Sequence, residues 1–256
     1  MSSTYWHKQT AEQPLFPDML WNQPENRMYA GKLLLISGSS SGFADAAEAY
    51  TAATKAGVGT VRVLLPDSLA RMVARLFPEV EFAPSTPSGS FASEALAEFL
   101  AASAWADGVL LPGSLSKNSE TAIVLEKFLE KYTGQVTLAG DAADYALNLP
   151  AVLSRLNTVF VLTFAEAQHF VTALKSPKPL KSDLGLVQIV DLLHEVSSGQ
   201  PWSLVVVHEG TAYVAVNGSI STTPTEKSTI EIASSASVWH LQNPQKPFES
   251  LTTALI

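Results

Sequence analysis

The stretch from Gly31 to Pro66 constrains the fold of this chain more than any other segment. It reads GKLLLISGSSSGFADAAEAYTAATKAGVGTVRVLLP. Two nearly unbroken apolar runs, Leu33–Ile36 and Thr60–Leu65, flank a segment whose apolar residues recur at steps of three and four. This pattern predicts a strand, a small-residue loop, a helix over about residues 43–56 and a second strand. Such a βαβ unit, with strands this apolar, is typical of a parallel sheet covered on both faces.

The loop between the first strand and the helix, residues 37–42, consists of serines, glycines and little else. It opens onto a helix N-terminus, where unpaired N–H groups and partial positive charge suit an anion. The same small residues also suit a tight turn at an ordinary crossover, and both interpretations stay open. The loop lacks the Gly-Lys-Ser/Thr of a phosphate-binding P-loop and the Gly-x-Gly-x-x-Gly of a dinucleotide site.

Apolar runs and amphipathic segments alternate along most of the remaining chain. An Asn217-Gly218 pair between two of the runs indicates a β-hairpin near the C-terminus. The alternation predicts a doubly wound α/β sheet, whose ligands bind outside the carboxyl ends of the strands. We predict further strands at 80–82, 108–111, 136–138, 158–162, 204–207, 212–216 and 219–222. We predict helices at 68–76, 91–105, 119–132, 163–174 and 184–196, the last capped by Ser182 or Asp183. Two more helices are predicted beyond Thr229, with breaks at Pro244 and Pro247.

Composition excludes several classes of function. The 256 residues carry a net charge of −8, which argues against non-specific nucleic-acid or anionic-membrane binding. Cysteine is absent, and the five histidines show no metal-ligand spacing, so no metal site is predicted. The N-terminus lacks the charged-then-apolar layout of a signal peptide, and no apolar run is long enough to span a membrane. We therefore expect a cytoplasmic protein.

The first thirty residues differ from the rest of the chain. They contain three prolines, no helical period and several large apolar residues, including Trp6 and Trp21. We predict that residues 1–30 form an arm, packed on the domain or on a neighbouring subunit. Residues 31–256 are then predicted to form one α/β domain.

The predicted strand ends carry the candidate functional residues. Asp141 follows one strand, where its carboxylate can bind a hydroxyl or a hydrated cation, or can cap the next turn. Lys117 follows another strand end and can either reach a phosphate or remain in solvent.

Three of these strand ends together resemble the ribokinase-like family of ADP- or ATP-dependent NAD(P)H-hydrate dehydratases. Ile36-Ser37-Gly38-Ser39 is similar to the family's Gly-Gly-Ser loop, and Pro112-Gly113-Ser114-Leu115-Ser116 to its Gly-Pro-Gly-Leu-Gly. Ala139-Gly140-Asp141-Ala142 keeps the second aspartate of the family's Asp-Ala-Asp-Ala strand end. The resemblance covers roughly residues 30–250 and implies a three-layer α/β/α sandwich with a mostly parallel sheet.

The chain departs from the family at three further motifs. Thr163 to Gln168 lacks the histidine and the glutamate of Thr-Pro-His-x-Gly-Glu, and His208 lies where the family has a lysine. The family's Gly-Thr-Gly-Asp signature cradles phosphate, and its best counterpart here is Ser228-Thr229-Ile230-Glu231. Serine and isoleucine replace both glycines, which is unfavourable wherever the backbone takes positive φ or approaches a ligand closely. Glu231 can be an acid or base there, or a solvated glutamate at a helix start.

The resemblance implies ADP or ATP with Mg²⁺, NAD(P)H hydrate as substrate, and a homo-oligomer. The residues carried over from the family comprise one catalytic candidate, Glu231, and a set of nucleotide- or substrate-binding candidates. The binding candidates are Gly38, Ser39, Gly113, Ser114, Asp141, Thr163, His208 and Thr229.

Three functions remain open at this point. The degraded signature favours a pseudoenzyme, meaning a homologue that keeps a nucleotide-binding cleft but has lost phosphoryl transfer. An active dehydratase, which would repair hydrated NAD(P)H, is the second. A ribokinase-like kinase for another small hydroxylated substrate is the third.

Overall fold

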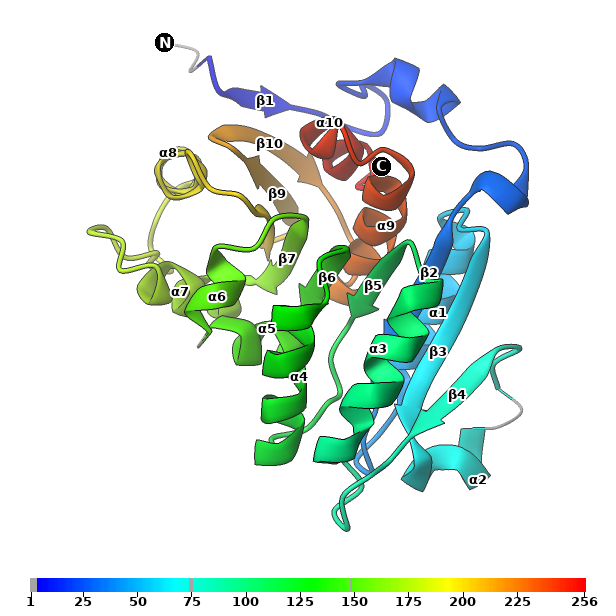
Figure 1. Cartoon of the computed structure of the whole chain (residues 1–256). Helices are drawn as coiled ribbons and strands as arrows, with labels where there is room; N and C mark the ends of the chain where they lie inside the picture. The colour runs from blue at the N-terminus through cyan, green and yellow to red at the C-terminus, as the bar shows by residue number, and fades with distance from the viewer. Residues whose placement is uncertain (1–3, 74–75, 148) are drawn as a thin grey trace.

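The computed structural model describes residues 4–73, 76–147 and 149–256. In these residues ten strands form one sheet between two layers of helices (Figure 1). The strands are β1 (Trp6–Lys8), β2 (Lys32–Ile36), β3 (Thr60–Pro66), β4 (Val80–Ala83), β5 (Gly108–Leu111), β6 (Gln135–Ala139), β7 (Thr158–Thr163), β8 (Ser203–His208), β9 (Thr211–Val216) and β10 (Ser219–Pro224).

The sheet is mostly parallel, in the order β1-β10-β9-β8-β7-β6-β5-β2-β3-β4. Only β9 runs antiparallel to its neighbours, because β8, β9 and β10 are joined by short turns. The chain winds outward from β2 in one direction and from β5 in the other, so the order reverses between these two strands. A reversal of this kind opens a crevice at the carboxyl edge, where open α/β sheets bind ligands.

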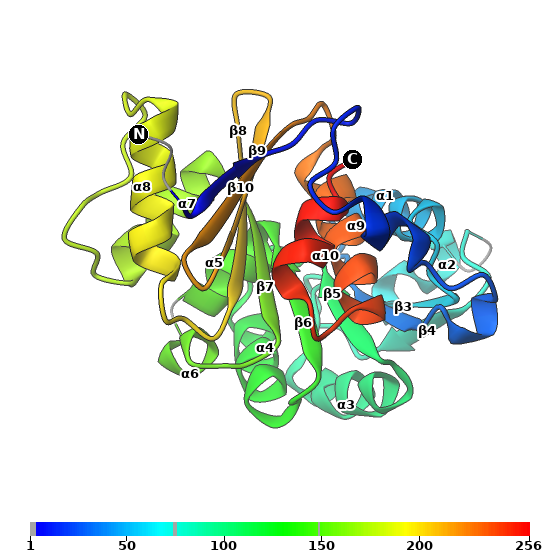
Figure 2. The same ribbon diagram turned by 90° about the horizontal axis from the view of Figure 1, so that it is seen from above.

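Helices cover both faces of the sheet (Figure 2). One face packs against α3, α4, α5, α6, α7 and α8, and the other against α1, α2, α9 and α10. Their bounds are α1 (Ala44–Lys55), α2 (Ala70–Val73), α3 (Leu96–Trp105), α4 (Ser119–Lys131), α5 (Gly140–Leu147), α6 (Pro150–Leu153), α7 (Phe164–Ala173), α8 (Leu186–Ser197), α9 (Thr229–Gln242) and α10 (Pro247–Thr253).

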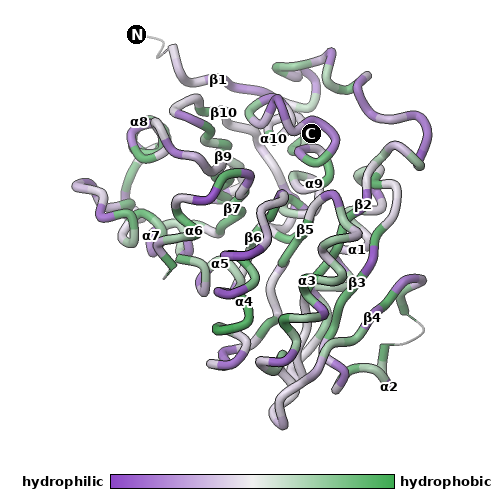
Figure 3. The backbone as a smooth tube through the Cα atoms, viewed as in Figure 1, coloured by the Kyte–Doolittle hydropathy of each residue, from purple (hydrophilic) through white to green (hydrophobic). Residues whose placement is uncertain are grey.

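The two cores follow from the alternation of side chains along each strand. In β2, Leu34 and Ile36 point into the core beneath α3 and α4, whereas Leu33 and Leu35 point into the core beneath α1 and α9. All four are fully buried, which explains why the sequence reads as an apolar run rather than as an alternating one. Along the chain, apolar segments follow the central elements, and polar residues concentrate in connections and at the periphery (Figure 3).

The structure confirms the predicted α/β class, the βαβ unit and the hairpin at Asn217-Gly218, and it corrects two local predictions. The predicted helix over 68–76 is a 3₁₀ turn (Asp67–Leu69) followed by α2, and residues 74–75 lie outside the described part. Neither Ser182 nor Asp183 caps α8, because Gly185 is its N-cap and Gln188 bonds back to the Gly185 N–H. Helices α5 and α6 and strand β1 were not predicted.

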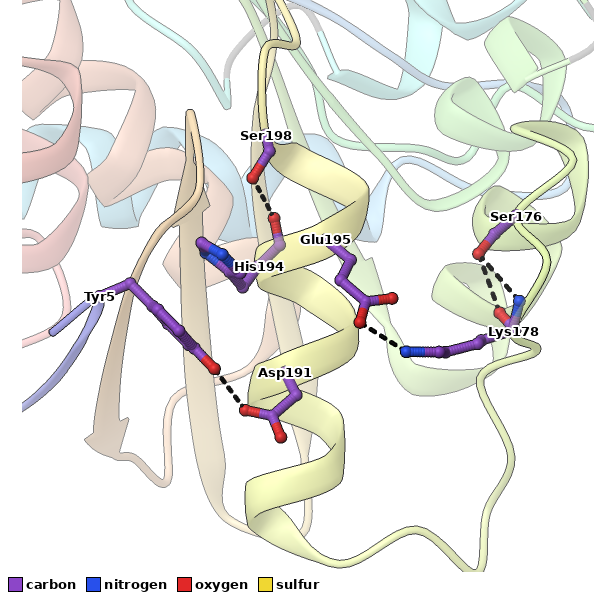
Figure 4. Close-up of polar contacts among 7 residues, drawn as sticks. All are labelled: Tyr5, Ser176, Lys178, Asp191, His194, Glu195 and Ser198. Atoms are coloured by element: carbon purple, nitrogen blue, oxygen red, sulfur yellow. Dashed lines mark hydrogen bonds and ion pairs between the residues drawn. The ribbon is translucent and has the colours of Figure 1, made fainter. Parts of the chain in front are cut away.

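The N-terminal arm lies against its own domain along β10. Strand β1 pairs in parallel with β10, and the buried Gln9 donates to Thr223 Oγ1 and to the Thr252 carbonyl. Before the strand, the Tyr5 ring stacks on His194 of α8 at 3.7 Å between centroids, and its hydroxyl donates to Asp191 at 2.6 Å (Figure 4). No helix in the described ranges is both long and apolar enough to cross a membrane.

Candidate functional site

The crevice between β2 and β5 is closed by direct contacts between the two strand ends. Ser37 donates from its hydroxyl to the Gly113 carbonyl at 2.6 Å, and both residues are buried. Gly38 adopts φ of 94°, and a Cβ there would lie only 3.0 Å from the side chains of Leu65 and Leu69. Ser39 is also buried, and its N–H donates to the Gly42 carbonyl. The candidate residues Gly38 and Ser39 therefore form a closed, packed floor at the end of β2, and the Ser39 amide is already used.

A second loop, residues 84–90, covers this floor at the bottom of the view in Figure 1. Ser40 N–H donates to the Gly89 carbonyl at 2.9 Å, which joins the loop to the end of β2. On its other side, the buried Ser90 hydroxyl lies 2.6 Å from that of Ser116. Short hydroxyl side chains allow this close approach, so three loops from separate parts of the chain form one hydrogen-bonded layer over the strand ends.

The Gly113–Ser116 turn forms a concave array of backbone N–H groups. Gly113, Ser114 and Ser116 all have positive φ, at 123°, 61° and 57°. A turn of this shape presents successive amides to one anion. That anion is the carboxylate of Asp141, which accepts from Leu115 N–H at 3.2 Å and from Ser116 N–H at 3.0 Å. Asp141, Gly113 and Ser114 are thus brought together as the sequence predicts, with the aspartate itself occupying the anion site.

Three carboxylates surround this turn. Burial raises the pKa of Asp141 above its ordinary value, against the lowering effect of the two amide hydrogen bonds. The charges of Asp45 and Asp144 raise the pKa of Asp141 further. Asp45 is in the first turn of α1, and its Oδ2 is 3.1 Å from the position of a Cβ on Gly113. The immediate surroundings of Asp141 are accordingly negative, and they favour a proton, a cation or a hydroxyl at this carboxylate over a bare anion.

A cavity of about 620 Å³ opens beside Asp141 on the face covered by α4, α5 and α7. Tyr145 fixes its rim, since its hydroxyl donates to the Ser116 carbonyl at 2.6 Å and accepts from Asn118 N–H at 2.8 Å. Lys117 and His169 line the same cavity and are exposed. The space is large enough for a small organic ligand, and its wall offers both signs of charge.

Thr163 and His208 lie at the same edge of the sheet, at the ends of β7 and β8. Thr163 is the N-cap of α7 and exchanges hydrogen bonds with Glu166 in a capping box. The His208 ring stacks on Phe164 at 3.8 Å between centroids. Both side chains therefore have structural contacts that stabilise the start of α7.

The start of α9 holds the counterpart of the phosphate-binding signature. Ser228 is its N-cap and accepts from Glu231 N–H at 3.0 Å, while the Glu231 carboxylate accepts from Ser228 N–H at 2.9 Å. The Ser228 hydroxyl donates to Glu48 of α1. No residue from 225 to 231, all of them described, has positive φ. Two backbone amides of this helix start are consequently satisfied by the chain's own side chains.

Glu231 faces a different space from Asp141. It lines a groove of about 920 Å³ between α1 and α9, together with Glu48, Lys227 and Trp239. The cavity beside Asp141 is on the other face of the sheet. Glu231 and Asp141 therefore do not share a pocket, and of the nine candidates carried over from the family only Asp141 lines the 620 Å³ cavity.

The structure adds residues that the sequence analysis missed or set aside. Asp45 and Glu48 are three residues apart near the start of a helix that was predicted. The sequence could therefore have shown that they share one face of that helix. Tyr145 belongs to a helix that was not predicted, and no signal marked it. Within the described ranges, no group of three or more histidine, aspartate or glutamate side chains could hold a metal ion.

Comparisons with known proteins match the architecture but not the sequence. No protein-family model matches the chain, and no curated protein does. Among solved structures, a ribokinase-like superfamily protein from Enterococcus faecalis matches with a TM-score of 0.71 at 14% identity, over 99% of this chain and 86% of that one. The fold is ribokinase-like.

Two further solved structures match this fold. A hypothetical protein from Streptococcus mutans matches with a TM-score of 0.69 at 15% identity, over 92% of this chain and 84% of that one. The ADP/ATP-dependent NAD(P)H-hydrate dehydratase of Bacillus subtilis, crystallised with ATP and Mg²⁺, has a TM-score of 0.63 at 12% identity, over 94% and 85%. At these identities the ribokinase-like comparison establishes the fold alone.

Proposed function

We propose that this chain is a pseudoenzyme relative of the NAD(P)H-hydrate dehydratases, which binds a small nucleotide-type ligand and does not transfer phosphoryl groups. The observation that carries the proposal is the capping box at the start of α9. Phosphoryl transfer needs preorganised donors and Mg²⁺ around the transferring group. Here Ser228 and Glu231 use the donors of that helix start for each other.

Electrostatics support the same proposal. The carboxylates of Glu48 and Glu231 both contact Ser228, so a terminal phosphate approaching this helix would meet two negative charges. Lys227 interacts electrostatically with Glu231, but its Nζ donates to the carbonyls of Ala254 and Ile256 and so is held away from a ligand at the helix start. The residues present do not fit a magnesium–nucleotide centre of the dehydratase kind.

The cavity beside Asp141 is the proposed ligand site. It lies at the carboxyl edge of the sheet, and Lys117 and His169 on its wall can contact a phosphate while Tyr145 borders the apolar part. The dehydratase from Bacillus subtilis was crystallised with ATP, so a nucleotide is the ligand class to test first.

An assay with hydrated NADH, ADP or ATP, and Mg²⁺ tests whether the chain has lost phosphoryl transfer. We expect no recovery of reduced-nicotinamide absorbance, even at high protein concentration. The Bacillus subtilis dehydratase serves as the positive control. Turnover that disappears in Glu231→Gln would contradict the proposal and assign Glu231 the role of acid or base.

Calorimetry with AMP, ADP, ATP and NADH tests the ligand site. We expect Lys117→Ala to weaken nucleotide binding about fivefold, as the loss of one partly exposed charge pair implies. Lys127→Ala is the matched control, since it removes an exposed positive charge from the following helix α4, away from the cavity wall. Equal affinities in the two variants, or no binding to the unmodified protein, would overturn the assignment.

We further propose that the chain forms a homo-oligomer through its arm. Trp21 and Met28 are 88% and 87% exposed, which is unfavourable for large apolar side chains in water. Light scattering after size exclusion should report more than one subunit, and Trp21→Ser with Met28→Ser should shift the protein towards a monomer. A monomeric unmodified protein at all concentrations would refute this proposal.

A further inference from the structure

A second polar cavity lies at the opposite edge of the sheet from the site just described. It has a volume of about 480 Å³ and is enclosed by residues just before or at the starts of strands, together with the end of α9. Gly31 precedes β2, Asp107 precedes β5, Gln135 begins β6 and Asn157 precedes β7. The cavity thus lies at the amino edge, separated from Asp141 by the full length of β6.

His240, in the last turn of α9, is the central residue of this region. It is only 5% exposed, and its Nδ1 atom is buried without any hydrogen-bond partner in the described structure. The Gln242 Oε1 atom on the same wall is also buried and unpaired. Buried polar atoms without partners are costly and rare, so these two give the cavity wall hydrogen-bonding capacity that no other group of the described chain uses.

The charges around this cavity restrict the class of ligand that it can bind. Burial lowers the pKa of His240 to about 4, so the imidazole is neutral at physiological pH. Asp107, which accepts from Lys32 N–H, is then the one charged side chain on the described wall. The C-terminal end of α9 adds partial negative charge. Anionic ligands are therefore disfavoured, and the site offers no cation to hold a phosphate or carboxylate.

The remaining wall supplies paired donors and acceptors. Four carboxamides contribute, and two of them are held in place: Gln135 donates to the Ser237 carbonyl, and Gln242 donates to the carbonyls of Ala30 and Gly57. Tyr29, 80% exposed, presents its ring at the rim. The carboxamides are those of Gln135, Asn157, Gln242 and Gln245.

An adjoining cavity of about 360 Å³ extends this region. It shares Asn157, His240 and Pro244 with the first cavity. Trp202 lies on its wall, and the indole N–H of Trp202 is buried without a partner in the described structure. Trp202 thus adds an unused donor within the wall of this second cavity.

We propose that the cavity around His240 binds an uncharged polyhydroxyl compound of mono- or disaccharide size. Hydroxyl groups act as both donor and acceptor, which matches a wall of carboxamides, one neutral imidazole and one carboxylate. A rigid aromatic ring at the rim provides a face for the C–H side of a sugar. This site is distinct from the nucleotide site and does not depend on it.

Saturation-transfer NMR and calorimetry with glucose, ribose and sucrose test the proposal on the full chain. Glucose 6-phosphate and gluconate are the charged counterparts. We expect at least one neutral sugar to bind in the millimolar range or tighter, and its charged counterpart to bind at least tenfold more weakly. Binding should also shift the imidazole resonances of His240. No binding of any neutral sugar, or equal binding of the charged forms, would overturn it.

Two conservative variants locate the site. Asn157 has φ of 54°, so Asn157→Gly removes its carboxamide without straining the turn, and Tyr29→Ala removes the exposed ring. Each should weaken sugar binding at least fivefold while the melting temperature stays within a few degrees. Lys175→Gly, at φ of 55°, and Met72→Ala, 60% exposed, are the matched controls outside the cavity. Sugar binding that both site variants leave unchanged would place the ligand elsewhere and refute the assignment.

Discussion

At the scale of single residues, the most informative side chain is Asp141. Its carboxylate fills the amide array that Gly113 to Ser116 creates, so the protein supplies its own anion at its sheet edge. An external phosphate would have to displace that carboxylate from two amides. The turn is therefore better suited to positioning Asp141 than to binding a nucleotide directly.

Removing the Asp141 carboxylate should destabilise the fold. Asp141→Ala leaves the Leu115 and Ser116 N–H groups without an acceptor, which costs about 1–3 kcal/mol of unfolding free energy. Asp141→Asn retains one acceptor and should cost less. Urea denaturation at constant pH measures both, and equal stability of Asp141→Ala and the unmodified protein would contradict the hydrogen bonds described.

The contribution of Asp141 to the stability of the fold should depend on pH in a definite direction. Burial raises its pKa in the folded state, so the folded protein binds this proton more tightly than the unfolded chain does. The contribution of Asp141 to stability should therefore increase as the pH falls through its folded-state pKa. The stability difference between the unmodified protein and Asp141→Asn, measured from about pH 7 to about pH 4, should shift in favour of the unmodified protein. A shift in the other direction would show that the amide bonds outweigh burial.

The capping box allows the structural role of Glu231 to be tested separately from a catalytic role. Glutamine forms the same back-bond to the Ser228 N–H, so Glu231→Gln should change the unfolding free energy by less than about 0.5 kcal/mol. Ser228→Ala removes the cap and should cost about 1 kcal/mol. Thermal denaturation of both variants tests this, and a large loss in Glu231→Gln would indicate a role for the charge itself.

At the scale of elements, the sequence predicted those parts whose hydrophobic pattern is long enough to read. The apolar run of β2 and the repeats of α1 and α4 were readable because each covers whole turns or a whole strand. Helix α5 was not, since it follows β6 without an intervening loop and its buried residues are mostly alanines over only eight positions. Strand β1 has three residues and no pattern of its own; only its partner β10 makes it a strand.

The candidate site, too, could be predicted from the sequence only in part. Strand ends could be located from the sequence, so Asp141, Gly113 and Ser114 were placed together. The roles of Thr163 and Ser228 as helix caps were also visible, because each is followed three residues later by a glutamate. What the sequence could not reveal is that α9 and α5 carry their residues to opposite faces of the sheet.

The Tyr5 contacts should hold the arm to α8. Tyr5→Phe keeps the stack on His194 and loses the hydrogen bond to Asp191, which we expect to cost about 1 kcal/mol. Hydrogen exchange of the β1 amides should become faster in this variant, since the arm then opens more often. Lys8→Ala is the control on the same strand. Unchanged exchange in Tyr5→Phe would show that pairing with β10 alone holds the arm.

At the scale of the whole molecule, the two edges of the sheet differ in their chemistry. The carboxyl edge carries acids held by backbone amides, and the amino edge carries carboxamides around a neutral histidine. Both sets of residues belong to one fold, and α9 links them: Glu231 lies in its first turn and His240 in its last. Ligands at the two edges are thus proposed to be chemically different.

The buried histidine makes global stability sensitive to acid. Because burial lowers the pKa of His240 to about 4, the unfolded chain binds this proton more tightly than the folded protein does. Its contribution to stability is fully present above about pH 6.5 and is lost as the pH falls towards about 4, a loss of about 3 kcal/mol. His240→Gln should flatten this part of the pH–stability curve in urea titrations. An identical curve in the variant would assign the acid sensitivity to other groups.

The pairing of β1 with β10 has a consequence for the order of events during synthesis. Residues near the start of the chain bond to partners 214 positions later, as between Gln9 and Thr223. The arm emerges from the ribosome before β10, so β1 has no partner strand until β10 has been made. The outer edge of the sheet can therefore be completed only after the nine strands from β2 to β10 have emerged.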